Sequence, residues 1–326
     1  MKMDERTLQV ATCCNLGVAH PPGYPLHTIL GAIFVRAIPY GSPAFRVNLL
    51  SALSASIAAG FFSACQTSSC ELRSFSQAQA SMAMTSSIVR AWSAFSFAFS
   101  PLVWTYATHA EVFAMNNMFV AVLLFLHLRF ALTKDPKGKK LMIECGNRGQ
   151  SMTAIISDAQ TAAMVIGLGS WGATDSMEGL IRHVLRSEYG TFRLYSGDDQ
   201  QVQTNLTNFL VKFGWELLQQ THYVGVLLAV VGFFYLFTGG KKNVRDKDKT
   251  DSAARCEHVV AKELLYLLSF YLLVFGSLSN LPDKSQMHLG VLKRFWMQAN
   301  LVVSVFIGDD SCSLNAVEML LLCHEV

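Results

Sequence analysis

The stretch from Val112 to Leu132, VFAMNNMFVAVLLFLHLRFAL, decides the fold class of this chain. Its apolar length matches the roughly 20 residues that an α-helix needs to cross the hydrocarbon core of a bilayer. Further apolar runs of this kind, the last of them short, cover Val47–Cys65, Met84–Trp104, His222–Gly239, Leu264–Leu278 and Met297–Ile307. The sequence therefore predicts an all-α, polytopic membrane protein.

The composition indicates the same class of protein. Of 326 residues, 52% are hydrophobic and 15% are charged, whereas soluble domains carry about 25% charged residues. The formal net charge of +3 is carried by local basic clusters, and no glycine-rich phosphate loop or HExxH signature occurs. The sequence gives no evidence for nucleic-acid binding, and its 8 scattered cysteines lack the spacing of a metal site.

Two apolar runs are weaker candidates for spans. Met152–Gly169 contains Asp158, and Leu26–Ile38 is too short to cross a bilayer unless it is strongly tilted. We therefore expect Leu26–Ile38 to be an interfacial or re-entrant helix. The N-terminal segment Met1–Arg6 is charged and leads into no hydrophobic signal sequence, so no cleavable signal peptide is expected.

Basic clusters orient the predicted spans. Residues 134–140 (KDPKGKK) and 241–249 (KKNVRDKDK) each follow a span and are expected on the cytosolic side. Alternation then places the N-terminal segment and the stretches 106–111, 171–221 and 280–293 on the opposite, lumenal side. Asn205 begins the sequon Asn-Leu-Thr in one of these stretches and is a candidate glycosylation site.

This order divides the chain into regions. Residues 1–132 hold an N-terminal lumenal loop and the first transmembrane group, and residues 133–170 hold a cytosolic basic loop and a weak span. Residues 171–221 form a lumenal loop, and residues 222–326 form the C-terminal transmembrane group. Most unusual combinations of polar residues lie in the lumenal regions, which we therefore take as the functional face.

A proline-rich loop, His20-Pro21-Pro22-Gly23-Tyr24-Pro25-Leu26, stands directly before the first apolar run. Its prolines fix φ and remove backbone donors, so this segment cannot be the interior of a helix. A rigid loop that carries His20 and Tyr24 at a membrane edge indicates a pocket wall. The alternative is a simple turn that leads into a helix.

Glu111 lies at the lumenal end of a span, and Asn117 lies deeper in the same span. A carboxylate at that depth is costly unless it is paired or lines a hydrated cavity, so Glu111 is a candidate binding residue. The alternative is a solvated helix N-terminus, where a carboxylate suits the helix dipole.

Arg46 and Arg294 stand at the lumenal ends of two other spans. Arginine at this level can bind a lipid phosphate through its forked guanidinium, or it can extend to the headgroups without a specific ligand. Asp4 and Glu5 form a pair of carboxylates near the N-terminus. They are either a general base for a hydroxyl group or part of a solvated terminus.

Five sequence blocks occur in an order that points to one family. They are HPPGYPL at His20–Leu26, RVNLLSAL at Arg46–Leu53, AEVFAMNN at Ala110–Asn117, LRSEYGTF at Leu185–Phe192 and RFWMQAN at Arg294–Asn300. Together they resemble the transmembrane protein 260 family. Members of this family are O-mannosyltransferases of the endoplasmic reticulum that modify IPT domains of plexins and related receptors, and they belong to the multi-span GT-C class.

The resemblance implies a partial GT-C-like transmembrane bundle with lumenal loops, placed as a multi-pass protein in the endoplasmic reticulum membrane. It implies dolichyl-phosphate mannose as the donor and Ser or Thr hydroxyls of lumenal IPT domains as acceptors, with membrane lipids as further partners. We expect no cofactor and assign no metal-ligating residues, and the sequence leaves metal dependence open. The catalytic base would be Asp4 or Glu5, and the residues that bind the substrate or donor would be His20, Tyr24, Arg46, Glu111, Asn117 and Arg294.

The chain also departs from the family pattern. Where the family has an Asp-Ser-Gly-Glu-Leu motif before HPPGYPL, this sequence reads Asp4-Glu5-Arg6-Thr7-Leu8. The first family span is missing, the segment between Lys140 and Trp171 is shorter, and the family continues beyond Val326. We therefore expect a truncated or alternatively spliced form, either active or inactivated by truncation. The alternatives are a polytopic transporter or channel, and a non-catalytic fragment that binds the full-length enzyme.

Overall fold

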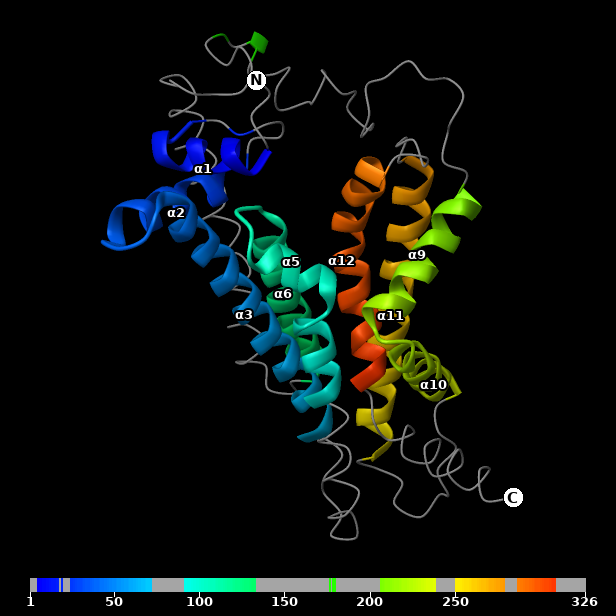
Figure 1. The fold of residues 1–326 in the computed structure, drawn as a ribbon. Helices are drawn as coiled ribbons and strands as arrows, with labels where there is room; N and C mark the ends of the chain where they lie inside the picture. Colours follow the sequence, from blue (N-terminus) through cyan, green and yellow to red (C-terminus); the bar gives the residue numbers. More distant parts are fainter. Residues whose placement is uncertain are drawn as a thin grey trace.

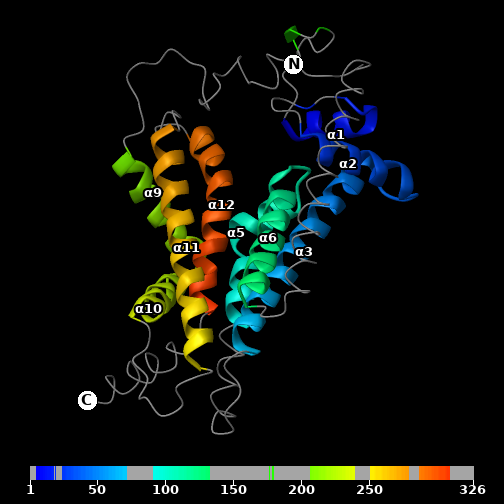
Figure 2. The ribbon, with the colours of Figure 1, turned by 180° about the vertical axis from the view of Figure 1, so that it is seen from behind.

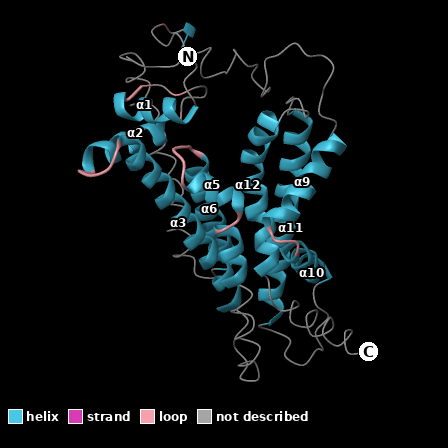
Figure 3. Ribbon diagram, viewed as in Figure 1, coloured by secondary structure: helices cyan, strands magenta, loops and turns pink. Residues whose placement is uncertain are grey.

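The computed structural model describes residues 5–17, 19, 24–71, 91–132, 176, 178–179, 206–238, 250–278 and 286–308. All regular secondary structure in these ranges is helical, which confirms the predicted all-α class (Figure 3). The N-terminal group comprises α1 (Glu5–Asn15), α2 (Pro25–Ala37), α3 (Pro43–Glu71), α5 (Pro101–Ala107) and α6 (Phe113–Leu132). The C-terminal group comprises α9 (Leu206–Gln220), α10 (Val224–Thr238), α11 (Thr250–Leu278) and α12 (Gln286–Gly308).

Two of the described helices are long and apolar enough to cross a membrane. They are the segments Pro43–Gln66 of α3 and Phe113–Phe130 of α6, and they confirm the spans predicted at Val47–Cys65 and Val112–Leu132. The run Leu26–Ile38 corresponds to α2, a shorter apolar helix, as expected from its length. The predicted runs Leu264–Leu278 and Met297–Ile307 lie within the longer helices α11 and α12.

The prediction of an independent span at His222–Gly239 is wrong. Helix α10 has 15 residues, which at 1.5 Å per residue is about 22 Å and short of the roughly 30 Å of a bilayer core. It continues α9 after a bend of 109°, so the two helices form one broken span or a re-entrant loop. The predicted lumenal loop 171–221 correspondingly contains a packed helix, α9, at its end.

The predicted span Met84–Trp104 is interrupted in its described part. Residues 91–98 are helical, the chain turns at Phe99 and Ser100, and α5 begins at Pro101. Proline fits the first turn of a helix but not its interior, which explains why the helix restarts there. The weak run Met152–Gly169 lies outside the described residues.

The two groups of helices meet along α12. Figures 1 and 2 show α12 between α5 and α6 on one side and α9 and α11 on the other, while α3 and α6 lie side by side. The largest core cluster spans both groups, with Phe62 from α3, Leu124 from α6, and Leu301 and Phe306 from α12. A second cluster joins α9 to α12 through Phe209, Phe213, Leu292 and Trp296.

Close contacts fix two helix crossings. A Cβ atom at Gly232 of α10 would overlap the backbone carbonyl oxygen of Phe306 on α12, so these helices cross at a distance that only glycine permits. A Cβ atom at Gly31 of α2 would lie 2.5 Å from the Sγ atom of Cys13 on α1. The helix pair α1–α2 is therefore packed tightly at the end of the bundle where α3 begins.

The ends of helices predicted to be lumenal lie together. Figure 1 shows α1 and α2 and the starts of α3, α9 and α12 at one end of the molecule. This arrangement is what a single functional face requires. Which side of the membrane this end occupies stays a prediction.

Candidate functional site

Glu111 and Arg294, predicted separately as binding residues, form an ion pair. The Nη1 atom of Arg294 lies 3.4 Å from the Oε2 atom of Glu111, and the two side chains are 18% and 6% exposed. Arg294 comes from α12, whereas Glu111 comes from the turn that joins α5 to α6. A charge buried at this depth is costly unless it is paired, so each group stabilises the other.

Aromatic rings enclose the guanidinium group of Arg294. Its Cζ atom lies 5.8 Å from the ring centre of Tyr106 on α5 and 5.7 Å from that of Phe113 on α6. Phe113 in turn contacts Phe295 edge to face, with ring centres 5.9 Å apart. The rings attract the cation and limit its orientations, so the guanidinium is held at a defined position.

The backbone around Glu111 is fixed from α1 and α3. The hydroxyl of Ser51 donates a hydrogen bond of 3.4 Å to the carbonyl oxygen of Glu111. Ala110, the preceding residue, is buried in a cluster with Cys13 of α1 and Val47 of α3. The turn that carries the carboxylate is therefore part of the packed end of the bundle.

Asn117 links α6 to α12 through hydrogen bonds, a short way along both helices from the Glu111–Arg294 pair. It is buried, its Nδ2 atom donates to the Sδ atom of Met297 at 3.6 Å, and its Oδ1 atom accepts a hydrogen bond of 3.1 Å from the Nε2 atom of Gln298. The structure thus brings Glu111, Asn117 and Arg294 to one interface between the two groups of helices.

Arg46 makes its hydrogen bonds elsewhere. Its Nη1 atom donates to the carbonyl oxygen of Val35 at 2.6 Å and its Nε atom donates to that of Tyr40 at 3.1 Å. Val35 lies in the last turn of α2, where carbonyl groups lack intrahelical partners. Arg46 therefore holds the corner between α2 and α3 rather than the Glu111–Arg294 pair.

Tyr24 has a left-handed backbone at the start of α2. Its φ and ψ angles are 45° and 59°, and Pro25 follows at the first position of the helix. The Tyr24 carbonyl oxygen accepts hydrogen bonds from the backbone nitrogen of Thr28 at 3.1 Å and from its hydroxyl at 3.2 Å. Positive φ is uncommon for residues other than glycine and often occurs at functional sites.

Comparison with known proteins gives the family of the chain. Residues 9–170, about half of the chain, match the family described as Protein O-mannosyl-transferase TMEM260 N-terminal domain. The chain belongs to the TMEM260 family. No solved structure matches it.

Two curated TMEM260 relatives match most of the chain. Protein O-mannosyl-transferase tmem260 of Dictyostelium discoideum is 28% identical over 362 residues, which cover 90% of this chain and 40% of the relative. Protein O-mannosyl-transferase TMEM260 of Mus musculus is 28% identical over 340 residues, which cover 90% of this chain and 44% of the relative. This TMEM260-family chain thus spans about two fifths of the length of these relatives.

Several predicted site residues of this TMEM260-family chain remain untested. Asp4, His20 and Asn205 lie outside the described residues, and Glu5 begins α1 without a described side chain. Their roles stay predictions. Within the described ranges, no group of three or more His, Cys, Asp or Glu side chains is placed to hold a metal ion.

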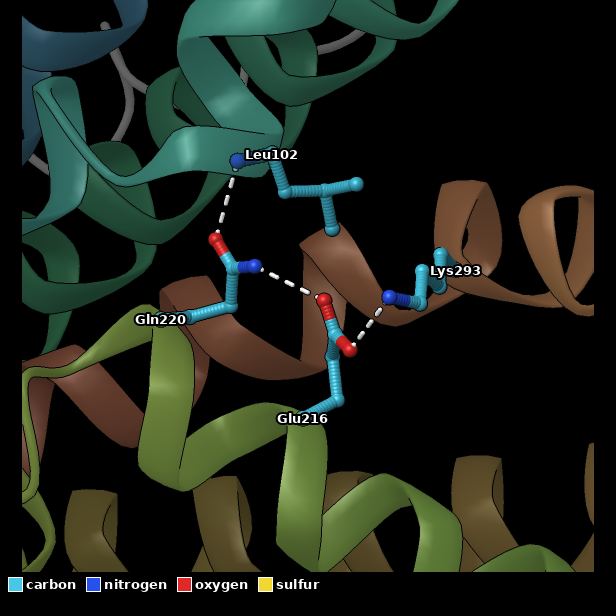
Figure 4. Close-up of polar contacts among 4 residues, drawn as sticks. All are labelled: Leu102, Glu216, Gln220 and Lys293. Carbon is cyan, nitrogen blue, oxygen red and sulfur yellow. Dashed lines mark hydrogen bonds and ion pairs between the residues drawn. The ribbon is translucent and has the colours of Figure 1, made fainter.

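Sequence reasoning missed a second buried charge, Glu216 on α9. Its Oε2 atom lies 2.7 Å from the Nζ atom of Lys293, and its Oε1 atom accepts a hydrogen bond of 2.8 Å from the Nε2 atom of Gln220 (Figure 4). The signal was present, because Phe209, Phe213, Glu216 and Gln220 recur at the spacing of one helical face. The prediction of a loop over residues 171–221 does not anticipate this helical face.

His27 was also missed. It is buried between α1 and α2, and its Nδ1 atom lies 2.9 Å from the Nε2 atom of Gln9. Burial lowers the pKa of His27 from 6.5 to about 4, because the charged form loses its hydration. The imidazole is therefore neutral near pH 7 and supports the packing of α1, the helix that Glu5 begins.

Proposed function

We propose that this chain acts in a membrane-embedded glycosyltransferase of the GT-C class. The enzyme would transfer mannose from dolichyl-phosphate mannose to Ser or Thr hydroxyls of lumenal IPT-type domains in the endoplasmic reticulum. The observation that carries the proposal is the buried Glu111–Arg294 pair, in a chain whose relatives are named protein O-mannosyl-transferases.

Arg294 has the properties that a site for a lipid phosphate needs. Its guanidinium lies at a helical interface, is enclosed by aromatic rings and already holds an anionic group, the Glu111 carboxylate. A phosphate offers the same forked acceptor geometry as a carboxylate and competes for the same donors. The prenyl tail of the donor would stay in the lipid phase while its phosphate and mannose reach the guanidinium of Arg294. A donor of this kind fits an enzyme that is embedded in the membrane.

The proposed transfer is a single inverting displacement. A carboxylate, assigned to Asp4 or Glu5, accepts the proton of the acceptor hydroxyl, and the hydroxyl oxygen forms a bond to the anomeric carbon of mannose. The bond between that carbon and the phosphate oxygen breaks, and dolichyl phosphate leaves with the electron pair. Arg294 stabilises the negative charge that develops on the phosphate. His20 and Tyr24 form the wall of the sugar pocket.

A transporter is the second candidate. The bend between α9 and α10 and the ion pair between buried Glu216 and half-buried Lys293 are features that transporters also use at substrate sites. Family membership favours the transferase, since the curated relatives carry that name. Uptake of substrate into proteoliposomes without any sugar transfer would favour the transporter.

Mannose transfer in a purified system tests the proposal. The chain, and in parallel a version completed to the length of its relatives, is incubated with dolichyl-phosphate mannose and a folded IPT domain. We expect mannose on Ser or Thr of the IPT domain, and loss of transfer in the double variant Asp4→Ala/Glu5→Ala. The control is Glu263→Gln, which changes a half-exposed carboxylate on α11. Unchanged turnover in the double variant would remove Asp4 and Glu5 from the mechanism.

A further inference from the structure

We propose that Glu216, Gln220 and Lys293 act as a clamp that positions Arg294 for the donor. The proposal rests on the function proposed above. The three side chains join α9 to α12 and to the first turn of α5, and Figure 4 shows the contacts. None of the three would touch the reacting atoms, so they are positioning residues.

Both oxygen atoms of Glu216 are engaged. One faces the ammonium group of Lys293 at 2.7 Å and the other accepts from the amide of Gln220 at 2.8 Å, in a residue only 4% exposed. A buried carboxylate with both oxygens occupied is not available as a general base. Its position is instead defined by two partners from two helices, which is the geometry of a structural support.

Gln220 carries this support to α5. Its Oε1 atom accepts a hydrogen bond of 2.9 Å from the backbone nitrogen of Leu102. Leu102 is in the first turn of α5, where the N–H groups have no intrahelical acceptor. Helix α5 also carries Tyr106, whose ring contacts the guanidinium of Arg294. The clamp therefore fixes one wall of the Arg294 site.

Lys293 and Arg294 are consecutive on α12 and are held by different groups of helices. Side chains one residue apart point about 100° apart around a helix. Lys293 accordingly reaches Glu216 on α9, whereas Arg294 reaches Glu111 beside α6. The two pairs together define the rotation of α12 about its axis. Loss of the Glu216–Lys293 pair frees that rotation and displaces Arg294.

The bend after Gln220 needs such support. His222 and Tyr223 have φ values of 53° and 61°, which lie in the left-handed region that residues other than glycine rarely adopt. Conformations of this kind persist only where the surrounding contacts impose them. Gln220 lies directly before the bend, and Phe213 packs against Trp296 of α12 with ring centres 5.9 Å apart.

Steady-state kinetics of the purified transferase distinguish positioning from simple stability. In the variant Glu216→Gln we expect the KM for dolichyl-phosphate mannose to rise at least fivefold while the KM for the IPT domain stays unchanged. A purely structural role would reduce the amount of active protein, so kcat would fall and both KM values would stay at wild type. The charge-swapped variant Glu216→Lys/Lys293→Glu should recover part of the donor KM, and Glu263→Gln is the matched control.

Thermal unfolding tests the clamp without any activity measurement. The Tm is measured for Glu216→Gln, Lys293→Met and the double variant. We expect the double variant to lose clearly less Tm than the sum of the single losses, because the two residues share one interaction. Additive losses, or an unchanged donor KM in Glu216→Gln, would overturn the clamp. A wild-type enzyme without mannose transfer would overturn the proposed function, while coupled Tm losses would still uphold the contact.

Discussion

Replacing Arg294 with methionine is expected to lower the free energy of unfolding by about 3–5 kcal/mol, the usual cost of removing one partner from a buried ion pair. The expected loss of stability is large because the Glu111 carboxylate stays buried after the substitution. Its side chain is 6% exposed, and in the wild type its Oε2 atom lies 3.4 Å from the Nη1 atom of Arg294. Methionine keeps the apolar bulk of the side chain. The cost therefore reports the loss of the cationic partner of Glu111 rather than a cavity.

Two further variants separate the contributions to this loss. Arg294→Lys keeps the charge but loses the planar contacts with Tyr106 and Phe113, which at about 0.5–1 kcal/mol each gives a loss of about 1–2 kcal/mol. The double variant Glu111→Gln/Arg294→Met removes both charges and should recover most of the loss, since neutral replacement of a buried pair costs little.

Unfolding in mixed detergent micelles, followed by tryptophan fluorescence and circular dichroism, gives these free energies for the wild type, the three variants above and the single variant Glu111→Gln. We expect a large coupling between positions 111 and 294. A cost of less than about 1 kcal/mol for Arg294→Met relative to wild type, or a double variant that loses the sum of the two single losses, would contradict a stabilising Glu111–Arg294 pair.

Three other predictions concern packing, pH and topology. Gly232→Ala should destabilise the protein by about 1–3 kcal/mol, because the added Cβ atom would overlap the carbonyl oxygen of Phe306. The control is Gly214→Ala on α9, where the added Cβ atom meets open space. This variant should be neutral or slightly stabilising in the same unfolding assay. The pKa of His27 falls from 6.5 to about 4 on folding, so the unfolded chain binds the proton first and stability falls as the pH drops through this window, by about 3 kcal/mol at its lower end. Tm measured from pH 7.5 to 4.5 should show this slope in wild type and a flatter one in His27→Gln. Asn205 should carry a glycan in microsomes, seen as a shift on endoglycosidase treatment that Asn205→Gln abolishes; an unshifted wild type would contradict the lumenal assignment.

The two long spans could be predicted because composition alone determines them. The helices α3 and α6 form their own backbone hydrogen bonds, and their uninterrupted apolar runs are long enough to match the bilayer. Neither property depends on contacts with other helices. The bend between α9 and α10 could not be predicted in this way. It occurs at Thr221-His222-Tyr223, without the glycine or proline that usually marks a broken helix, and depends on contacts with α5 and α12.

The sequence predicts individual residues of the candidate site but not which of them form an ion pair. Glu111 and Arg294 were each unusual for their place at a span end, but their partnership depends on how α12 packs against α5 and α6, which no local pattern records. Arg46 looked equivalent to Arg294 in the sequence. It differs because its guanidinium donates to the carbonyl oxygens of Val35, in the last turn of α2, and of Tyr40, in the segment that follows α2.

The dependence of mannose transfer on Arg294 shows whether this guanidinium binds the donor phosphate. Radiolabelled dolichyl-phosphate mannose is titrated against the purified enzyme and a folded IPT domain, with wild type, Arg294→Lys and Arg294→Gln compared at equal amounts of folded protein. We expect the donor KM to rise at least tenfold in Arg294→Gln and less in Arg294→Lys, while the acceptor KM stays constant. An unchanged donor KM in folded Arg294→Gln would show that this guanidinium does not bind the donor phosphate.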